Sequence, residues 1–349
     1  MSDPERVLAA TASADEPDVD RQLRPRHLAE FVGQDQLREQ LGILIDAARS
    51  RREPVEHLLF SGPPGLGKTT LATIVAAETG ANLRVTSGPA IEFQGALASL
   101  LTSLGEGDVL FIDEIHRLQR AVEESLYPAM EEFRFDFVSG KGVGAQALRL
   151  PLQRFTVIGA TTMVGTISAP LRDRFGASFR LNFYSAAELE TIVRRSAGLL
   201  EVPVSDAAAR LIAARSRGTP RVANRLLRRL RDYAQVRADG AVSEEMAQEA
   251  LQLLEVDQQG LDASDRRLLR LICEQFGGGP VGLGTLGAAL SEQPHTIEEV
   301  LEPYLLQLGM LARTPRGRVA TGAAFRHLGL AAPAGTPGAE APVELFGEA

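Results

Sequence analysis

The stretch Gly62-Pro63-Pro64-Gly65-Leu66-Gly67-Lys68-Thr69 decides the fold that this 349-residue sequence predicts. It follows an apolar run at 57–61 and precedes a helix-length segment that begins at Lys68. The spacing G-x-x-x-x-G-K-[ST] between a strand and a helix is typical of a phosphate-binding loop. An ordinary glycine-rich turn is the alternative. Because motif and context agree, the sequence favours phosphate binding.

Each residue type in this loop suits a nucleotide triphosphate. Glycine backbone N–H groups can curl around a phosphate, and the N-terminus of the next helix adds partial positive charge. Lys68 would neutralise charge on the β- and γ-phosphates, and the Thr69 hydroxyl would be a ligand of Mg²⁺. We therefore expect ATP and Mg²⁺ as cofactors. The residues expected to bind the phosphates are Gly62, Gly65, Leu66, Gly67, Lys68, Thr69 and Thr70.

Polar residues end two further apolar runs. The run at 108–113 ends in Asp113 and continues into Glu114, and a later run ends in Thr161 and Thr162. Buried parallel strands deliver their C-terminal residues to the ligand crevice of an α/β sheet. Asp113 would then hold Mg²⁺ and Glu114 would polarise the attacking water, with Thr162 near the γ-phosphate. The alternative is that the two acids only cap the following helix, and that small polar residues end the later strand by chance.

The pattern along the chain predicts three folded domains. Apolar runs alternate with helix-length segments up to about residue 184, which indicates a parallel α/β sheet. Capping signals at Ser185, Ser205, Pro220 and Ser243 then predict a small helical domain. Short helices followed by a hairpin at 311–321 suggest a winged helix. The expected strands are 57–61, 82–86, 108–113, 154–160 and 179–183. The expected divisions are a disordered 1–20, an ATPase domain 21–184, a helical lid 185–256, a winged-helix domain 257–330 and a flexible tail 331–349.

Composition excludes several classes of protein. No apolar run reaches the roughly 18 residues that cross a bilayer, so we expect no membrane association and a cytoplasmic protein. The single cysteine, Cys273, excludes an internal disulfide. The net charge of −8 argues against a general polyanion binder, but nine arginines gather in 210–237. Because charge is sorted along the chain, nucleic-acid binding is not excluded.

The segment 133–152 has two interpretations. Phe133, Phe135 and Phe137 alternate with polar residues, and Leu148, Leu150 and Leu152 do the same after a glycine-rich turn. This period of two predicts a hairpin with one apolar face. That face could be buried as an ordinary sheet extension, or it could protrude as a surface that binds a partner.

Taken together, these residues resemble the AAA+ ATPases, and within them the RuvB family of Holliday-junction branch-migration motors. The likeness covers about residues 20–328. Two C-terminal stretches discriminate best, GGPVGL at 278–283 and RTPRGR at 313–318. The other matching stretches are LRP at 23–25, FVGQ at 31–34, the loop 62–69, DEIHRL at 113–118, LYPAME at 126–131, GATT at 159–162, PLRDRFG at 170–176, RGTPR at 217–221 and EPYLL at 302–306.

The resemblance implies further roles. The fold would be an AAA+ P-loop parallel-sheet domain followed by a helical lid and a winged helix. The chain would form a hexameric ring that drives duplex DNA through a Holliday junction, working with the junction-binding protein RuvA and a resolvase. Arg174 would act in trans as an arginine finger, and Arg221 would sense the nucleotide. The adenine pocket would include Leu23, Arg24, Tyr184 and Pro220, RuvA would dock on 133–152, and the DNA contacts would be Arg313, Arg316 and Arg318.

Two other functions stay open from the residues alone. A clamp-loader-like AAA+ ATPase would share the loop and the finger, but its C-terminal domain would normally be a helical collar. An initiator-like switch would bind duplex DNA and use ATP only for assembly. The presence of Glu114 and Arg174 favours an enzyme that hydrolyses ATP over such a switch.

Overall fold

The computed structural model describes residues 22–139, 146–237 and 239–338. These residues form two compact units. The sheet unit holds 22–192 together with 219–221, and the helical unit holds 193–218 and 222–338. The expected disorder of 1–20, the turn of the hairpin and the end of the tail lie outside the described residues.

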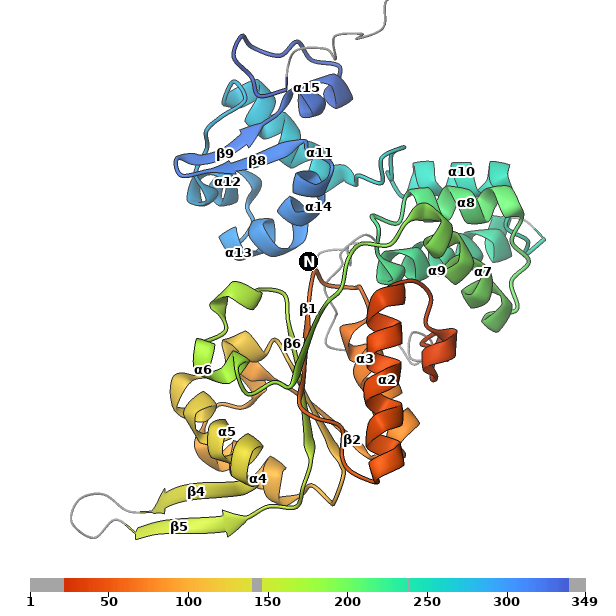
Figure 1. Ribbon diagram of the computed structural model, residues 1–349. Coiled ribbons are helices and arrows are strands. Elements are labelled where there is room, and N and C mark those ends of the chain that lie inside the picture. The colour runs from red at the N-terminus through yellow and green to blue at the C-terminus, as the bar shows by residue number, and fades with distance from the viewer. Residues whose placement is uncertain (1–21, 140–145, 238, 339–349) are drawn as a thin grey trace, which may run out of the picture. The chain divides into compact units, whose positions relative to one another are not determined.

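The sheet unit is built on five parallel strands in the order β2-β3-β6-β1-β7. Helices α2 and α3 cover one face, and α4, α5 and α6 lie on the other (Figure 1). The strands are β1 (Leu58–Ser61), β2 (Leu83–Ser87), β3 (Val109–Asp113), β6 (Thr156–Thr161) and β7 (Ala177–Arg180). The helices are α2 (Asp35–Arg51), α3 (Lys68–Thr79), α4 (Gln94–Thr102), α5 (Arg120–Glu132) and α6 (Ala169–Arg172).

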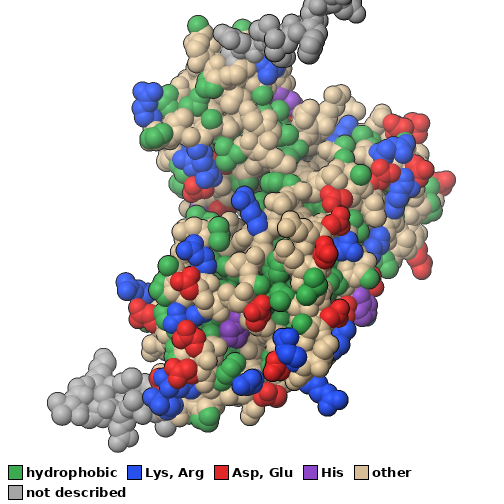
Figure 2. Space-filling model, viewed as in Figure 1, with side chains coloured by type: hydrophobic (Ala, Val, Ile, Leu, Met, Phe, Trp, Pro, Cys, Tyr) green, Lys and Arg blue, Asp and Glu red, His purple; other side chains and the backbone are tan. Residues whose placement is uncertain are grey.

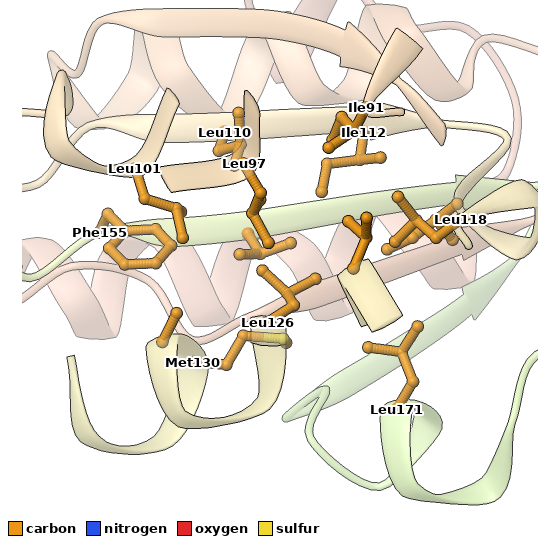
Figure 3. Close-up of a cluster of buried hydrophobic side chains, with 14 of the residues drawn as sticks. Ile91, Leu97, Leu101, Leu110, Ile112, Leu118, Leu126, Met130, Phe155 and Leu171 are labelled. Carbon is orange, nitrogen blue, oxygen red and sulfur yellow. The ribbon is translucent and has the colours of Figure 1, made fainter. Parts of the chain in front are cut away.

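The core of this unit follows from its apolar runs. Residues of β1, β3 and β6 are buried almost without interruption, as parallel strands covered on both faces require. Helix α5 buries Val122, Leu126 and Met130 against this sheet, at the spacing of one helix face. Figure 3 shows how Leu126 and Met130 lie among side chains from α4, β3 and α6.

One expected strand is displaced. The sequence predicts a strand at 179–183, whereas β7 spans Ala177–Arg180. Its partner β1 ends at Ser61, which lies opposite Arg180, and then turns into the glycine loop. Only one more ladder bond follows, from the Leu181 N–H to the Ser61 carbonyl at 2.8 Å. The turn of the partner strand therefore ends β7 early.

A hairpin leaves the sheet unit after α5. Strand β4 (Arg134–Ser139) pairs antiparallel with β5 (Gln146–Pro151), so the predicted hairpin is confirmed. It forms a sheet of its own that extends beyond α4 and α5 (Figure 1). At its base Phe135 is fully buried in the core, and Leu150 packs against the same cluster. The base thus buries apolar side chains as an ordinary sheet would.

The helical unit contains the expected four-helix segment. Ser205 and Ser243 cap their helices through bonds from the backbone N–H groups of Ala208 and Met246. Ser185 and Glu188 form the predicted reciprocal capping bonds at the start of α7. The helices are α7 (Ala186–Leu199), which begins in the sheet unit, α8 (Asp206–Ala214), α9 (Pro220–Arg237) and α10 (Glu244–Leu253).

The same unit ends in a winged helix. Short helices surround a buried apolar cluster, and β8 (Leu311–Thr314) pairs antiparallel with β9 (Gly317–Ala320) as the wing. Val281 adds a bridge to Arg318, and Gly317 is needed there because a Cβ would lie 2.4 Å from the Val281 carbonyl oxygen. The helices are α11 (Ala263–Arg270), η6 (Leu271–Gln275), α12 (Leu283–Leu290), α13 (Pro294–Thr296), η7 (Ile297–Leu301), α14 (Glu302–Gln307) and α15 (Gly322–Leu328).

The first part of the expected tail is held in place. Residues 331–338 return to α15, where the Gly322 N–H donates to the Pro337 carbonyl at 2.8 Å. Arg326 also donates to the Gly338 carbonyl at 3.2 Å. The Gly322 backbone N–H and the Arg326 side chain therefore contact 337–338, and the flexibility expected of 331–349 stays a prediction. Residues 339–349 lie outside the described part of the chain.

Candidate functional site: a nucleotide site at the carboxyl edge of the sheet

Three neighbouring strands bring the predicted catalytic residues to one edge. Strand β6 lies between β1 and β3, so Thr162 follows a strand that is flanked by the phosphate loop and by Asp113-Glu114. The register pairs Ser61 with Thr161. All three strands are parallel and end at the same edge, where α/β sheets bind ligands. The residues therefore lie at one edge of the sheet, and their catalytic roles stay predictions.

The loop adopts a conformation that requires its glycines. Gly62, Gly65 and Gly67 have φ angles of 141°, 80° and 107°, in the region that other residues avoid. A Cβ at Gly62 would also lie 2.6 Å from the Leu181 carbonyl oxygen. Gly67 is the N-cap of α3, so the first amides of that helix face the loop. The backbone is shaped to donate several N–H groups to one anion.

Among the residues that the structure describes, the direct partners of the Lys68 ammonium are neutral groups. Its Nζ donates to the carbonyl oxygens of Gly62 at 2.7 Å and Pro63 at 2.9 Å. The side chain is buried. Burial lowers the pKa of the Lys68 ammonium to about 8, although Asp113 and Glu114 nearby favour its charged form. A bound phosphate would favour the charged form and raise this pKa again.

Glu114 is held by two neighbours. Its backbone is left-handed, with a φ angle of 46°. Thr162 Oγ1 donates to Glu114 Oε2 at 3.1 Å, and His116 Nδ1 lies 3.2 Å from the same oxygen. His116 Nδ1 also lies 3.0 Å from Thr161 Oγ1. No role for His116 was predicted from the sequence, although this residue lies two positions after Glu114.

The segment expected to sense the nucleotide lies at the loop. The Arg221 N–H donates to the Gly65 carbonyl at 3.4 Å, and the Arg221 charge also lowers the pKa of Lys68. On the other side, Tyr184 donates its hydroxyl to the Leu66 carbonyl at 3.0 Å. Burial raises the pKa of the Tyr184 hydroxyl. Of the other expected pocket residues, Leu23 is buried, Arg24 is half-buried, and Pro220 begins α9.

These residues fit a nucleotide with a divalent cation. The glycine loop, the first turn of α3 and Lys68 suit the phosphates, and Asp113 with Thr69 offers the hard oxygen ligands that Mg²⁺ prefers. Within the described residues no group of three or more His, Cys, Asp or Glu is placed to hold a metal ion. A Mg²⁺ ion bound with a nucleotide takes most of its ligands from phosphates and water, so one carboxylate and one hydroxyl suffice.

Arg174 lies just after α6, apart from the residues above. Its guanidinium carbon is 4.2 Å from the centroid of the Tyr127 ring, and its Nη2 lies 3.2 Å from Glu131. Nη1 donates to the Pro170 carbonyl at 2.6 Å. On the face shown in Figure 2, acidic and basic side chains are interspersed over this part of the sheet unit.

The wing arginines differ among themselves. Arg313 and Arg318 both bind Glu302, at 2.8 Å and 2.6 Å, and the Glu302 side chain is fully buried. Glu298 lies within 3.6 Å and 3.4 Å of the same two guanidinium groups. Arg316, at the exposed tip, makes no ion pair with any residue that the structure describes. The DNA contact expected of all three arginines stays a prediction, and the structure favours it most for Arg316, because that side chain is exposed and has no ion-pair partner among the described residues.

Fold and site together define the class of protein: a P-loop ATPase unit of the AAA+ type, followed by a helical lid and a winged helix. Family profiles match all three parts: the Holliday junction DNA helicase RuvB P-loop domain at 23–181, the RuvB AAA lid domain at 184–257, and the RuvB C-terminal winged helix domain at 258–329. The chain belongs to the RuvB family.

Relatives and solved structures agree with this assignment. The chain is 57% identical over 338 residues to the Holliday junction branch migration complex subunit RuvB of Salinispora arenicola, which covers 97% of this chain and 96% of that protein. It is 60% identical over 329 residues to the subunit of the same name from Chloroflexus aurantiacus, covering 94% of each. The Thermotoga maritima RuvB Holliday junction branch migration motor has a TM-score of 0.81 at 48% identity, covering 89% of this chain and 100% of that one.

The resemblance predicted from the motifs is therefore confirmed, and so is the fold class. Among the described residues, no helix is long and apolar enough to span a membrane.

Proposed function

We propose that this protein is an ATP-driven motor that moves duplex DNA to migrate the branch of a Holliday junction. The convergence of Lys68, Glu114 and Thr162 at one sheet edge supports it most strongly, because phosphate binding and water activation need these groups together. The substrate, a Holliday junction, is inferred from membership of the RuvB family. The lid and the winged helix supply what a simple ATPase would lack: a part that responds to nucleotide and a part that binds DNA.

The residues of the sheet edge divide the work of hydrolysis. The loop amides and Lys68 bind the β- and γ-phosphates, while Thr69 and Asp113 hold Mg²⁺, which neutralises charge on the phosphates when bound. Glu114 orients and polarises the attacking water. Thr162 and His116 hold the Glu114 carboxylate. The adenine pocket is formed by Leu23, Arg24, Tyr184 and Pro220.

Ring assembly and partners complete the proposal. The chain forms a hexamer in which Arg174 reaches the neighbouring nucleotide and Arg221 couples the nucleotide to the lid. The wing contacts phosphates without reading sequence, as a motor that moves along any duplex requires. RuvA docks on the hairpin 133–152, and a resolvase acts on the migrated junction. The proposed domains are the ATPase domain 21–184, the helical lid 185–256 and the winged-helix domain 257–330.

The test is conversion of a synthetic four-way junction to duplex products with RuvA, Mg²⁺ and ATP. We expect wild type to convert the junction and Glu114→Gln to bind ATP but turn it over at least about 100-fold more slowly, because the amide cannot polarise water. Glu124→Gln, an exposed carboxylate on α5, is the matched control. ATP turnover without conversion would favour a clamp-loader-like ATPase, and binding without turnover would favour an initiator-like switch.

A further inference from the structure

The guanidinium of Arg174 is held in a defined position on the surface of its own chain. Its guanidinium carbon lies over the Tyr127 ring, 4.2 Å from the ring centroid, a distance typical of a cation–π contact. Its side chain is 21% exposed. Its Nε is buried and finds no hydrogen-bond partner within the described residues. An arginine that served only to stabilise the fold would be expected to use such a donor.

The Tyr127 ring is itself fixed by a network. Its hydroxyl donates to Glu123 at 2.5 Å and lies 3.3 Å from the Ser168 hydroxyl. Ser168 also donates to Glu123 and accepts from the Leu171 N–H at 3.2 Å, which caps α6. The same network therefore fixes the ring and the short helix that leads to Arg174. Burial raises the pKa of the Tyr127 hydroxyl, so it keeps its proton and donates at neutral pH.

The contacts of Arg174 differ in the part of the guanidinium that they occupy: the Tyr127 ring lies against its carbon, the Pro170 carbonyl accepts from Nη1, and Glu131 lies at Nη2. A ring binds the face of a guanidinium and leaves its N–H edge open to another anion. Glu131 instead occupies that edge, at 3.2 Å from Nη2. A phosphate would have to displace Glu131 but could bind while the ring contact persists. The ring contact is therefore compatible with the active finger, in which Arg174 binds a phosphate. The Glu131 contact would exist only while no phosphate is bound.

From this geometry we propose that Tyr127 is a positioning residue that holds Arg174 in the direction from which it reaches a neighbouring subunit's nucleotide. The inference rests on the proposed trans finger. An arginine side chain loses rotamer entropy when it is fixed. Because the ring fixes Arg174 in advance, the finger binds the transition state without that cost. Tyr127 acts on the neighbour's site and not on its own.

Single variants give the first readout. Tyr127→Leu keeps apolar volume but removes the ring face, and should lower the kcat for ATP about tenfold with little change in KM. Tyr127→Phe keeps the face and should stay within about twofold of wild type. Glu131→Gln should turn over at least as fast as wild type, since the resting partner is weakened. Tyr233→Leu, whose hydroxyl also faces a glutamate, is the matched control and should leave turnover unchanged.

Mixed rings give the decisive readout. Lys68→Ala subunits lack nucleotide but keep their fingers, so adding them in excess should restore turnover per Tyr127→Leu subunit. Adding Arg174→Ala subunits in place of Lys68→Ala should not restore it. If Lys68→Ala rescues Arg174→Ala but not Tyr127→Leu, the positioning role is overturned and the trans finger stands. If it rescues neither, although mixed rings form by native mass spectrometry, the trans finger fails and the inference fails with it. Thermal melting of each variant identifies a folding defect, which mixing could not rescue.

Discussion

Lys68 and the wing arginines are all predicted to bind phosphate groups, yet Lys68 and the pair Arg313 and Arg318 have different kinds of partner in the structure. Neutral carbonyls bind the Lys68 ammonium, and burial lowers its pKa to about 8. A buried carboxylate, Glu302, binds Arg313 and Arg318. A cation without a direct anionic partner gains most from an incoming phosphate, whereas a cation already paired with a carboxylate would have to exchange one anion for another. The kind of partner that a basic residue has therefore indicates whether the residue is available to bind a ligand or serves to stabilise the fold.

The largest effect should come from removing the carboxylate of the wing. Glu302→Ala leaves two guanidinium groups without their shared partner, and we expect a loss of about 3 kcal/mol in the free energy of unfolding. Urea denaturation of the full chain measures it. Glu299→Ala, an exposed neighbour, should change stability by less than about 0.5 kcal/mol. A similar small loss for Glu302→Ala would mean that the pair does not hold the wing.

The pH dependence of ATP binding should give an intermediate effect. Because the pKa of Lys68 is lowered to about 8, the ammonium loses its proton as pH rises through 8, and a bound phosphate restores it. The association constant for ATP should therefore fall by up to about tenfold per pH unit above 8, with proton uptake on binding. Titration calorimetry in buffers of different ionisation enthalpy measures both. Lys141→Ala, at the only other lysine, should keep this profile, and a constant affinity up to about pH 9.5 would contradict it.

The smallest effect should come from the wing tip. Arg316→Ala should weaken duplex binding equally for all sequences and reduce the slope of log K against log salt by about 1, because one phosphate contact is lost. The unfolding free energy should stay the same, since the side chain is exposed and unpaired among the described residues. Fluorescence anisotropy at several salt concentrations measures the slope. If Arg313→Ala changed the slope as much while Arg316→Ala did not, the comparison between the two kinds of cation would fail.

Much of the fold could be predicted because its signals are local. Strands β1 and β3 follow from uninterrupted apolar runs, and the caps at Ser205 and Ser243 follow from side chains that bond within three residues of themselves. The phosphate loop could be predicted for the same reason, because its glycines and Lys68 lie within eight consecutive residues. The bounds of β7 were missed because its partner strand, far away in sequence, decides where pairing ends.

The site was predicted only in part for the same reason. Lys68, Asp113 and Glu114 carry motifs, but the contact of His116 with Glu114 and Thr161 depends on how β3 and β6 lie beside each other. Tyr127 looked like one residue of a matching stretch. Its place under Arg174, 47 residues later, needed the packing of α5 against α6.

The class of fold, the phosphate loop and the family could be predicted from residue order, because each depends on short spans of the chain. The tertiary structure alone decided which charged groups have partners. Glu302 binds Arg313 and Arg318, the Tyr127 ring lies against the Arg174 guanidinium, and the Lys68 ammonium donates to carbonyl oxygens. Coulomb interactions and cation–π contacts act over a few ångströms in space, between residues that the chain brings together only when it folds.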